Sequence, residues 1–235
     1  MPLPPMSVSQ SRTIFAIAAT ALVLHTRLFI PWLSDVTGIE TIVSWFLCAG
    51  LGVFLPLIIA GWLLLEKEGD ISPRSWRDRL RFRRMNRGDW IWTAGGVMAV
   101  GILGMAIMKL IELSTGSIDS QPSFMRFEPL GPGRYWILIA WLPFWLLNIM
   151  GEEFLWRGVM LPRMEAGIGR AAWLHHGFGW ALFHLAFGWQ LFLTMLPILF
   201  ILPFIVQRRG NSWIGVIIHA VLNGPAFVLI ALGVL

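Results

Sequence analysis

Two adjacent glutamates, Glu152 and Glu153, lie inside a long apolar stretch, and Arg157 follows four residues after the second. The stretch, Tyr135–Met164, is long enough to cross a bilayer, which takes about 20 mostly apolar residues. A charged side chain at the bilayer centre costs roughly 2.5–3.5 kcal/mol on insertion scales, and such residues usually face a protein interior or a water-filled cavity. These three residues are therefore the first candidates for a functional site.

The spacing within this group allows one glutamate to pair with the arginine and leaves the other without a basic partner. Glu153 and Arg157 are four residues apart, so on a helix they lie one above the other and can form an ion pair. Glu152 is turned by about 100° and cannot share that arginine equally well. A buried carboxylate without a basic partner suits a general base or acid. A purely structural ion pair is the alternative, and it leaves Glu152 unexplained.

Two later apolar segments also carry polar residues. Ala171–Phe187 contains His184, and Ser212–Leu235 contains His219 and Asn223, four residues apart on one helical face. His219 and Asn223 can both donate hydrogen bonds toward a developing oxyanion.

The depths of these groups in the membrane overlap. At 1.5 Å per residue from the expected cytoplasmic ends, Glu152 lies about 16–18 Å deep, His184 about 20 Å, and His219 and Asn223 about 10–17 Å. Three helices could therefore deliver these side chains to one pocket near the middle of the membrane.

Other polar residues have simpler explanations. His175 and His176 lie near the end of their segment, where a hydrogen bond to a neighbouring helix accounts for them equally well. Lys109 and Glu112 are three residues apart near a segment end and are expected to be a pair that reaches the interface. Arg27 is expected to be interfacial.

The composition is that of a polytopic membrane protein. Of the 235 residues, 57% are hydrophobic and 13% are charged, whereas a soluble domain carries about 25% charged residues. Eight of the eighteen basic residues fall within Lys67–Arg87, a clustering that predicts a cytoplasmic loop rather than a nucleic-acid-binding surface. We therefore expect membrane lipids as partners and no nucleic acid. The single cysteine, Cys48, rules out a disulfide framework within the chain.

We expect an all-α, polytopic transmembrane helical bundle of about seven spans. It forms a single integral membrane domain over residues 1–235, with N-terminal spans lacking motifs in residues 12–113 and a motif-bearing catalytic core in residues 135–235. The predicted spans are Thr13–Leu33, Thr41–Leu65, Trp90–Leu113, Tyr135–Met164, Ala171–Phe187, Leu191–Val206 and Ser212–Leu235.

The distribution of basic residues predicts the orientation. It places Lys67–Asp89 and the N-terminus in the cytoplasm and Ser114–Arg134 outside. The short chain and its spare loops lead us to expect a bacterial inner membrane. Within the basic loop, Ser72 before Pro73 predicts the start of a short helix.

One face of this short helix, with Trp76 and Leu80, could press into the lipid headgroups, while Arg77, Arg81 and Arg84 line the opposite side. A solvated charged loop is an equally good alternative.

Three short motifs resemble a known family, the CAAX prenyl endopeptidase and bacteriocin-processing (CPBP, or ABI) family of intramembrane proteases. Its first motif, Glu-Glu-x-x-x-Arg, is found at Glu152–Arg157. Its second, Phe-x-x-x-His, is matched by Trp180–His184, with tryptophan in the phenylalanine position. Its third, His-x-x-x-Asn, is found at His219–Asn223. Each motif alone is weak, but the three in this order are fairly specific.

The resemblance implies a helical membrane protease whose cavity opens toward the cytosol or the membrane interface. It implies that Glu152 and His184 activate a water for attack on a peptide carbonyl of a membrane-associated peptide or protein substrate. It also implies that His219 and Asn223 stabilise the oxyanion.

The resemblance further implies supporting roles for Glu153 and Arg157, which would orient the site. Trp180 is expected to occupy a packing position, which narrows the pocket without changing the chemistry.

Two alternatives stay open. Glu152, His184 and His219 could bind Zn²⁺ as a metalloprotease does, because two histidines and one glutamate with an open fourth position form a known catalytic set. A glutamate and a histidine can equally activate water without an ion. The fold could also serve as a non-enzymatic scaffold or a bacteriocin self-immunity protein. A transporter is disfavoured, because the chain shows no inverted repeat.

Overall fold

The computed structural model describes residues 3–69, 72–119 and 121–234, and all regular structure in these ranges is helical. The α-helices are α1 (Val8–Leu24), α2 (Ile30–Thr37), α3 (Thr41–Ala49), α4 (Leu55–Glu66), α5 (Pro73–Arg79), α6 (Arg87–Thr115), α7 (Trp136–Glu152), α8 (Leu161–Ile168), α9 (Ala172–His184), α10 (Trp189–Arg209) and α11 (Trp213–Ala231). Wider π-helical segments join α1 to α2, α3 to α4 and α7 to α8, namely η1 (His25–Phe29), η2 (Gly50–Phe54) and η4 (Glu153–Met160). Short 3₁₀ turns are η3 (Ser123–Met125), η5 (Gly169–Ala171) and η6 (Leu185–Phe187).

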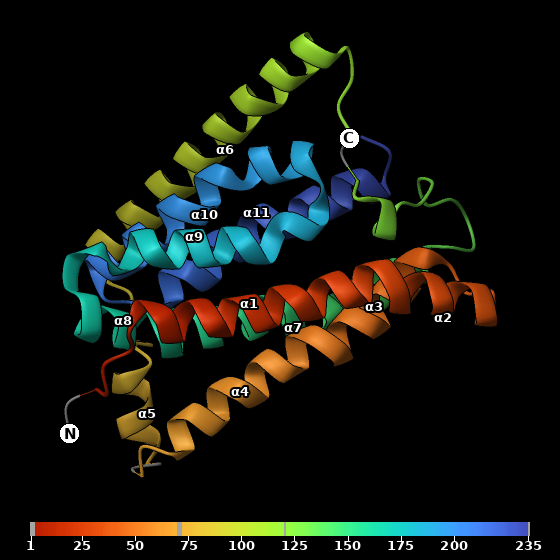
Figure 1. The fold of residues 1–235 in the computed structure, drawn as a ribbon. Coiled ribbons are helices and arrows are strands. Elements are labelled where there is room, and N and C mark those ends of the chain that lie inside the picture. The colour runs from red at the N-terminus through yellow and green to blue at the C-terminus, as the bar shows by residue number, and fades with distance from the viewer. Residues whose placement is uncertain (1–2, 70–71, 120, 235) are drawn as a thin grey trace.

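In the described ranges, six helical runs are long and apolar enough to cross a membrane. One of them, Trp136–Phe187, has 52 residues and reverses direction at Gly169, where φ is +67°. Glycine adopts this conformation at little cost. The run therefore makes two passes, first through α7–α8 and then through α9, as Figure 1 shows. Six runs with one double pass give seven passes, which confirms the predicted all-α bundle of about seven spans.

The helix ends follow local signals in the sequence. Asn86 caps α6, since its side chain accepts from the backbone N–H of Asp89 while the Asp89 carboxylate accepts from the N–H of Asn86. Gly116, with φ of +79°, ends the same helix. Between such ends the apolar segments must be helical, because hydrocarbon offers no partner for an unpaired backbone group.

One end of the bundle gathers the N-terminal segment, α5 and the α8–α9 and α10–α11 turns (Figure 1). The N–H of Met6 donates to the carbonyl of Arg163 (2.8 Å), and Arg163 Nε donates to Glu68 (2.6 Å). The N–H of Ser212 donates to the carbonyl of Arg81 (3.0 Å). These contacts hold the segments predicted to be cytoplasmic at a common end, and the assignment of that end to the cytoplasm remains a prediction.

The opposite end carries the loop predicted to lie outside. There the N–H of Leu130 donates to the carbonyl of Ala231 at 2.8 Å. Both arginines of this loop are paired, Arg126 with Asp119 (2.6 Å) and Arg134 with Glu40 (Nε–Oε1 3.1 Å). Their charges are thus balanced by neighbouring carboxylates.

The helix predicted after Ser72 forms as α5, and the Ser72 side chain accepts from the N–H of Ser75. The segment also makes packing contacts that neither predicted alternative included. Leu80 is buried and lies against Gly158 of η4, whose added Cβ would approach Leu80 Cδ2 to 3.2 Å. Trp76 packs edge-on against Trp62, with ring centroids 4.3 Å apart. Leu80 at the end of this segment therefore covers part of η4, and Trp76 packs against α4.

Helix α9 carries the second motif and packs between α1 and α10 (Figure 1). A Cβ added to Gly179 would lie 2.1 Å from Phe15 of α1, and one added to Gly177 would lie 2.5 Å from Phe200 of α10. Only glycine permits this approach on both sides. The motif-free first span thus supports the wall of the motif-bearing core.

Candidate active site

The first motif lies where α7 changes into a π-helical segment. Glu152 is the last residue of α7 and Glu153 is the first of η4, which contains Arg157. A regular α-helix was expected through this region. Such π segments are rare and occur frequently at functional sites. Both Glu153 and Arg157 are fully buried.

Glu153 joins two helices through one oxygen. Its Oε1 lies 3.0 Å from Arg157 Nη1, which confirms the expected ion pair, and 2.9 Å from Nδ1 of His219 on α11. Its Oε2 has no hydrogen-bond partner among the described residues and lies against Gly215. A Cβ added to Gly215 would come within 2.4 Å of this oxygen. The carboxylate therefore occupies the space that a side chain at position 215 would fill.

Arg157 is held by charge and by an aromatic face. Its Cζ lies 3.4 Å from the ring centroid of Trp180. Although Nη1 is within ion-pair distance of Glu153, none of the three guanidinium nitrogens makes a well-directed hydrogen bond to a described residue. The cation–π contact and the ion pair together stabilise a charge that would otherwise be costly to bury.

Glu152 stands outside the ion pair, as its position in the sequence predicts, but it is not free. Its Oε2 accepts a 2.6 Å hydrogen bond from the indole Nε1 of Trp180. Among the described residues, its Oε1 has only a long contact, 3.4 Å, with Nδ2 of Asn148 one turn earlier. The carboxylate is 2% exposed, so it is sheltered from bulk water.

His184 presents one nitrogen as a base. Its Nδ1 lies 2.9 Å from the carbonyl oxygen of Trp180. Because a carbonyl can only accept, Nδ1 carries the hydrogen, and the lone pair of the neutral ring is on Nε2. Both His184 and Glu152 contact the indole of Trp180.

Trp180 lies at the centre of these groups. Besides the contacts to Glu152 and Arg157, its ring meets those of His184 and His219 edge-on, at centroid distances of 5.3 and 5.6 Å. Trp180 is at a buried packing position, as predicted, but it does more than fill space, because its indole N–H donates to Glu152. The signal was present in the sequence, since tryptophan has a donor that the phenylalanine of the family motif lacks.

The structure brings five of the six predicted site residues together and leaves one at the edge. Asn223 follows His219 by one turn of α11, but its side chain is exposed and makes no hydrogen bond to a described residue. His176, by contrast, is buried, and its Nε2 lies 3.1 Å from the carbonyl of Trp156. This contact supports the structural explanation of His176.

The three possible zinc ligands are not arranged around a common point. Among the described residues, no three histidine, cysteine, aspartate or glutamate side chains are arranged to hold a metal, and this includes Glu152, His184 and His219. His219 directs Nδ1 at Glu153, and Glu152 accepts from Trp180. The residues present do not fit the zinc site considered from the sequence.

Residues 134–224 match the family described as type II CAAX prenyl endopeptidase, Rce1-like. No curated protein and no solved structure matches the chain. The matched segment covers less than half of the 235 residues but contains all three motifs, from the start of α7 into α11. The match confirms the family that the motifs indicated: over residues 134–224, this integral membrane protein is similar to the Rce1-like type II CAAX prenyl endopeptidases, a family of proteases.

Proposed function

We propose that the chain is an intramembrane endopeptidase that hydrolyses a peptide bond of a membrane-associated substrate. The observation that carries this proposal is the convergence of Glu152, His184 and His219, from three helices, around the indole of Trp180. Glu152 is the one carboxylate of the motif that no arginine neutralises. The family match supports the same class of reaction.

In the proposed first step, Glu152 and His184 activate a water molecule. The lone pair of His184 Nε2 accepts one hydrogen bond from the water, and Oε1 of Glu152 accepts the proton that the water loses. Oε1 suits this role because, within the part of the chain that the structure describes, its one polar contact is the 3.4 Å approach of Asn148. The water oxygen then bonds to the peptide carbonyl carbon. A positioned general base of this kind contributes about 10²–10⁴-fold to a rate.

In the second step, His219 and Asn223 stabilise the oxyanion. Nδ1 of His219 donates to the Glu153 carboxylate, which can only accept, so Nε2 can donate to the substrate oxyanion when the ring carries a proton on both nitrogens. The exposed amide of Asn223 is one turn away and supplies a second donor. The intermediate collapses when the C–N bond breaks and Glu152 returns its proton to the leaving amine. One such oxyanion donor contributes about 10²–10³-fold.

Glu153 and Arg157 hold the site in place without taking part in the proton transfers. No step of the proposed reaction uses a metal. Arg157 neutralises Glu153, and Glu153 fixes the ring of His219. We expect protein purified in the presence of a chelator to keep its activity. Elemental analysis together with the cleavage assay checks this, and activity restored only by Zn²⁺ would contradict the metal-free mechanism.

We further propose that the end bearing α5 and the α8–α9 and α10–α11 turns faces the cytoplasm. The basic residues of these segments support this orientation through the positive-inside bias. The N-terminus is at the same end (Figure 1) and is then cytoplasmic as well.

The test uses the protein reconstituted in liposomes and an internally quenched peptide that ends in a prenylated Cys-aliphatic-aliphatic-x sequence. In parallel, cells with the wild-type chain and with Glu152→Ala are compared by quantitative proteomics for processed membrane proteins. We expect Glu152→Ala and His184→Ala to insert normally and to lose cleavage by at least about 10²-fold. Lys109→Ala, far from the motifs in sequence and exposed, is the matched control.

Full activity of both variants on a substrate that the wild type cleaves would overturn the mechanism. Glu152→Gln separates the enzyme from the scaffold or immunity protein, because it removes the base with almost no change of shape. A biological effect that survives Glu152→Gln, with no cleavage by the wild type, would overturn the proposed protease in favour of a binding role.

A further inference from the structure

We propose that Trp180 is a positioning residue, whose indole N–H holds the carboxylate of Glu152 in the orientation that the reaction needs. This inference rests on the proposed function. The contact is short, 2.6 Å from Nε1 to Oε2, and both side chains are almost fully buried, at 1% and 2% exposure. No bulk water competes for the bond at that depth.

The indole is itself fixed on several sides. The guanidinium of Arg157 covers its face at 3.4 Å, and the rings of His184 and His219 meet it edge-on. An aromatic ring enclosed in this way cannot turn without displacing those groups. The direction of its N–H is therefore set by the same ion pair and histidines that make up the site.

The consequence for Glu152 is that its two oxygens differ. Oε2 accepts from the indole, whereas the described residues offer Oε1 only the long contact to Asn148. Without the indole donor, no close hydrogen bond to a described residue would fix the carboxylate, and it could rotate about its terminal bond. A base that is held in the reactive geometry reacts faster than one that adopts it only part of the time. Misplacement by about 1 Å can lower the rate by about 10²-fold.

Trp180 also positions the second group that touches the water. Its backbone carbonyl receives Nδ1–H of His184, which leaves the lone pair on Nε2. This second contact uses the backbone, so it persists in any side-chain variant at position 180. A substitution of the side chain therefore isolates the effect on Glu152.

The decisive variants remove the N–H, and one of them also keeps the shape of the indole. Trp180→Phe supplies the residue type of the family motif, and replacement of Trp180 by 3-benzothienylalanine keeps the full bicyclic shape with sulfur in place of the N–H. We expect each to lower kcat by about 10–100-fold, the loss of one hydrogen bond to a charged group, with KM nearly unchanged. The assay uses the prenylated quenched peptide or a substrate found in the proteomic comparison.

The matched control is the same pair of replacements at Trp145. This residue lies on α7 and stacks on Trp141 with ring centroids 5.4 Å apart, and its buried Nε1 has no hydrogen-bond partner among the described residues. We expect kcat to stay at the wild-type value in the Trp145 variants. Equal losses at both positions would mean that ring packing, not the N–H, explains the effect, and would overturn the inference.

A spectroscopic measurement tests the hydrogen bond independently of cleavage. In protein with ¹⁵N-labelled indoles, the Nε1–H signal that Trp180→Phe removes should be shifted downfield and should move upfield in Glu152→Ala. If the wild type cleaves no substrate but the signal behaves so, the proposed function fails while the contact stands. If the wild type is active, an unmoved signal, or a Trp180→Phe variant with wild-type kcat, would overturn the inference alone.

Discussion

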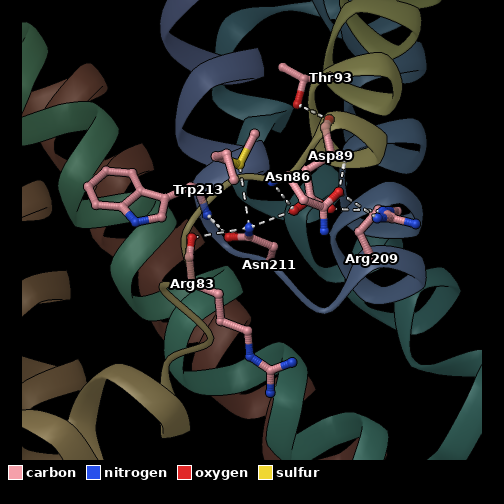
Figure 2. A network of polar contacts seen from close by, with 8 residues as sticks. Arg83, Asn86, Asp89, Thr93, Arg209, Asn211 and Trp213 are labelled. Carbon is pink, nitrogen blue, oxygen red and sulfur yellow. Dashed lines mark hydrogen bonds and ion pairs between the residues drawn. The ribbon is translucent and has the colours of Figure 1, made fainter.

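Asp89 and Glu153 are both buried carboxylates that face an arginine, but their surroundings differ. Figure 2 shows the Asp89 cluster. There Oδ1 accepts from Arg209 Nε (2.9 Å), and Oδ2 accepts from Asn211 Nδ2 (3.2 Å) and from the N–H of Asn86 (3.1 Å). The carbonyl of Asp89 accepts from the hydroxyl of Thr93 (2.8 Å). Each oxygen of Asp89 thus has a partner.

At Glu153 the partners are fewer. Oε1 serves both Arg157 and His219, while Oε2 has no hydrogen-bond partner among the described residues. Nε, Nη1 and Nη2 of Arg157 likewise make no hydrogen bond to a described residue. Leaving a buried polar group unsatisfied costs about 1–3 kcal/mol, so such groups call for an explanation.

The difference indicates two uses of buried charge. The Asp89 cluster ties the start of α6 to the α10–α11 turn, and a closed set of hydrogen bonds suits that structural task. The Glu153 cluster lies beside the candidate base, Glu152. Several of its donors and acceptors have no hydrogen-bond partner among the described residues. Proteins commonly give up local consistency at functional sites and recover stability elsewhere.

The largest expected effect is that of Arg157→Met. It leaves the Glu153 carboxylate buried without its counter-charge, so we expect the free energy of unfolding to fall by about 3–5 kcal/mol and cleavage to be lost. Denaturant unfolding in micelles and the peptide assay measure the two effects. A loss no greater than that of a surface ion pair, about 0–1 kcal/mol, would contradict the assignment of a dry, essential pair.

A smaller but more local effect is expected from Gly215→Ala. The new methyl group would lie 2.4 Å from Glu153 Oε2, so the carboxylate and the ring of His219 must shift. We expect kcat to fall by about 10²-fold. Gly101→Ala on α6 is the matched control, because its added Cβ meets no atom within 4 Å and its kcat should stay at the wild-type value. Wild-type kcat in Gly215→Ala would show that this contact does not determine the geometry of the site.

The Asp89 cluster should respond in stability alone. Asp89→Asn keeps the shape but removes the charge that Arg209 faces, and Arg209 is partly open to water. We expect the free energy of unfolding to fall by about 1–3 kcal/mol with kcat unchanged. A double-mutant cycle with Arg209→Met isolates the pair. A drop in kcat at equal folded fraction would remove the contrast between the two clusters.

The smallest effect is expected from Lys109→Ala. Lys109 and Glu112 form an exposed pair at 2.8 Å, three residues apart on α6. Such a pair contributes about 0.2–0.5 kcal/mol, so unfolding and cleavage should both match the wild type closely. A larger loss of stability would mean that even exposed charges at the end of α6 are structural.

The amino-acid sequence by itself determined the features that depend on near neighbours in the chain. Apolar segments long enough to cross a bilayer predicted the seven passes, and the four-residue spacing predicted the ion pair of Glu153 with Arg157. Ser72 before Pro73 predicted the start of α5. Each of these follows from helix geometry or capping, which act within one or two turns.

Only the tertiary structure decided which groups meet across helices. The contact of Trp180 with Glu152 joins residues 28 positions apart, and that of His219 with Glu153 joins residues 66 positions apart. Neither follows from periodicity, because the rotation and depth of a packed helix are set by its neighbours, here through close approaches such as that of Gly179 to Phe15. For the same reason Asn223, placed on the face of His219 by its spacing, could not be predicted to be exposed. The sequence determines which residues each helix contains, and tertiary packing determines which groups each side chain contacts.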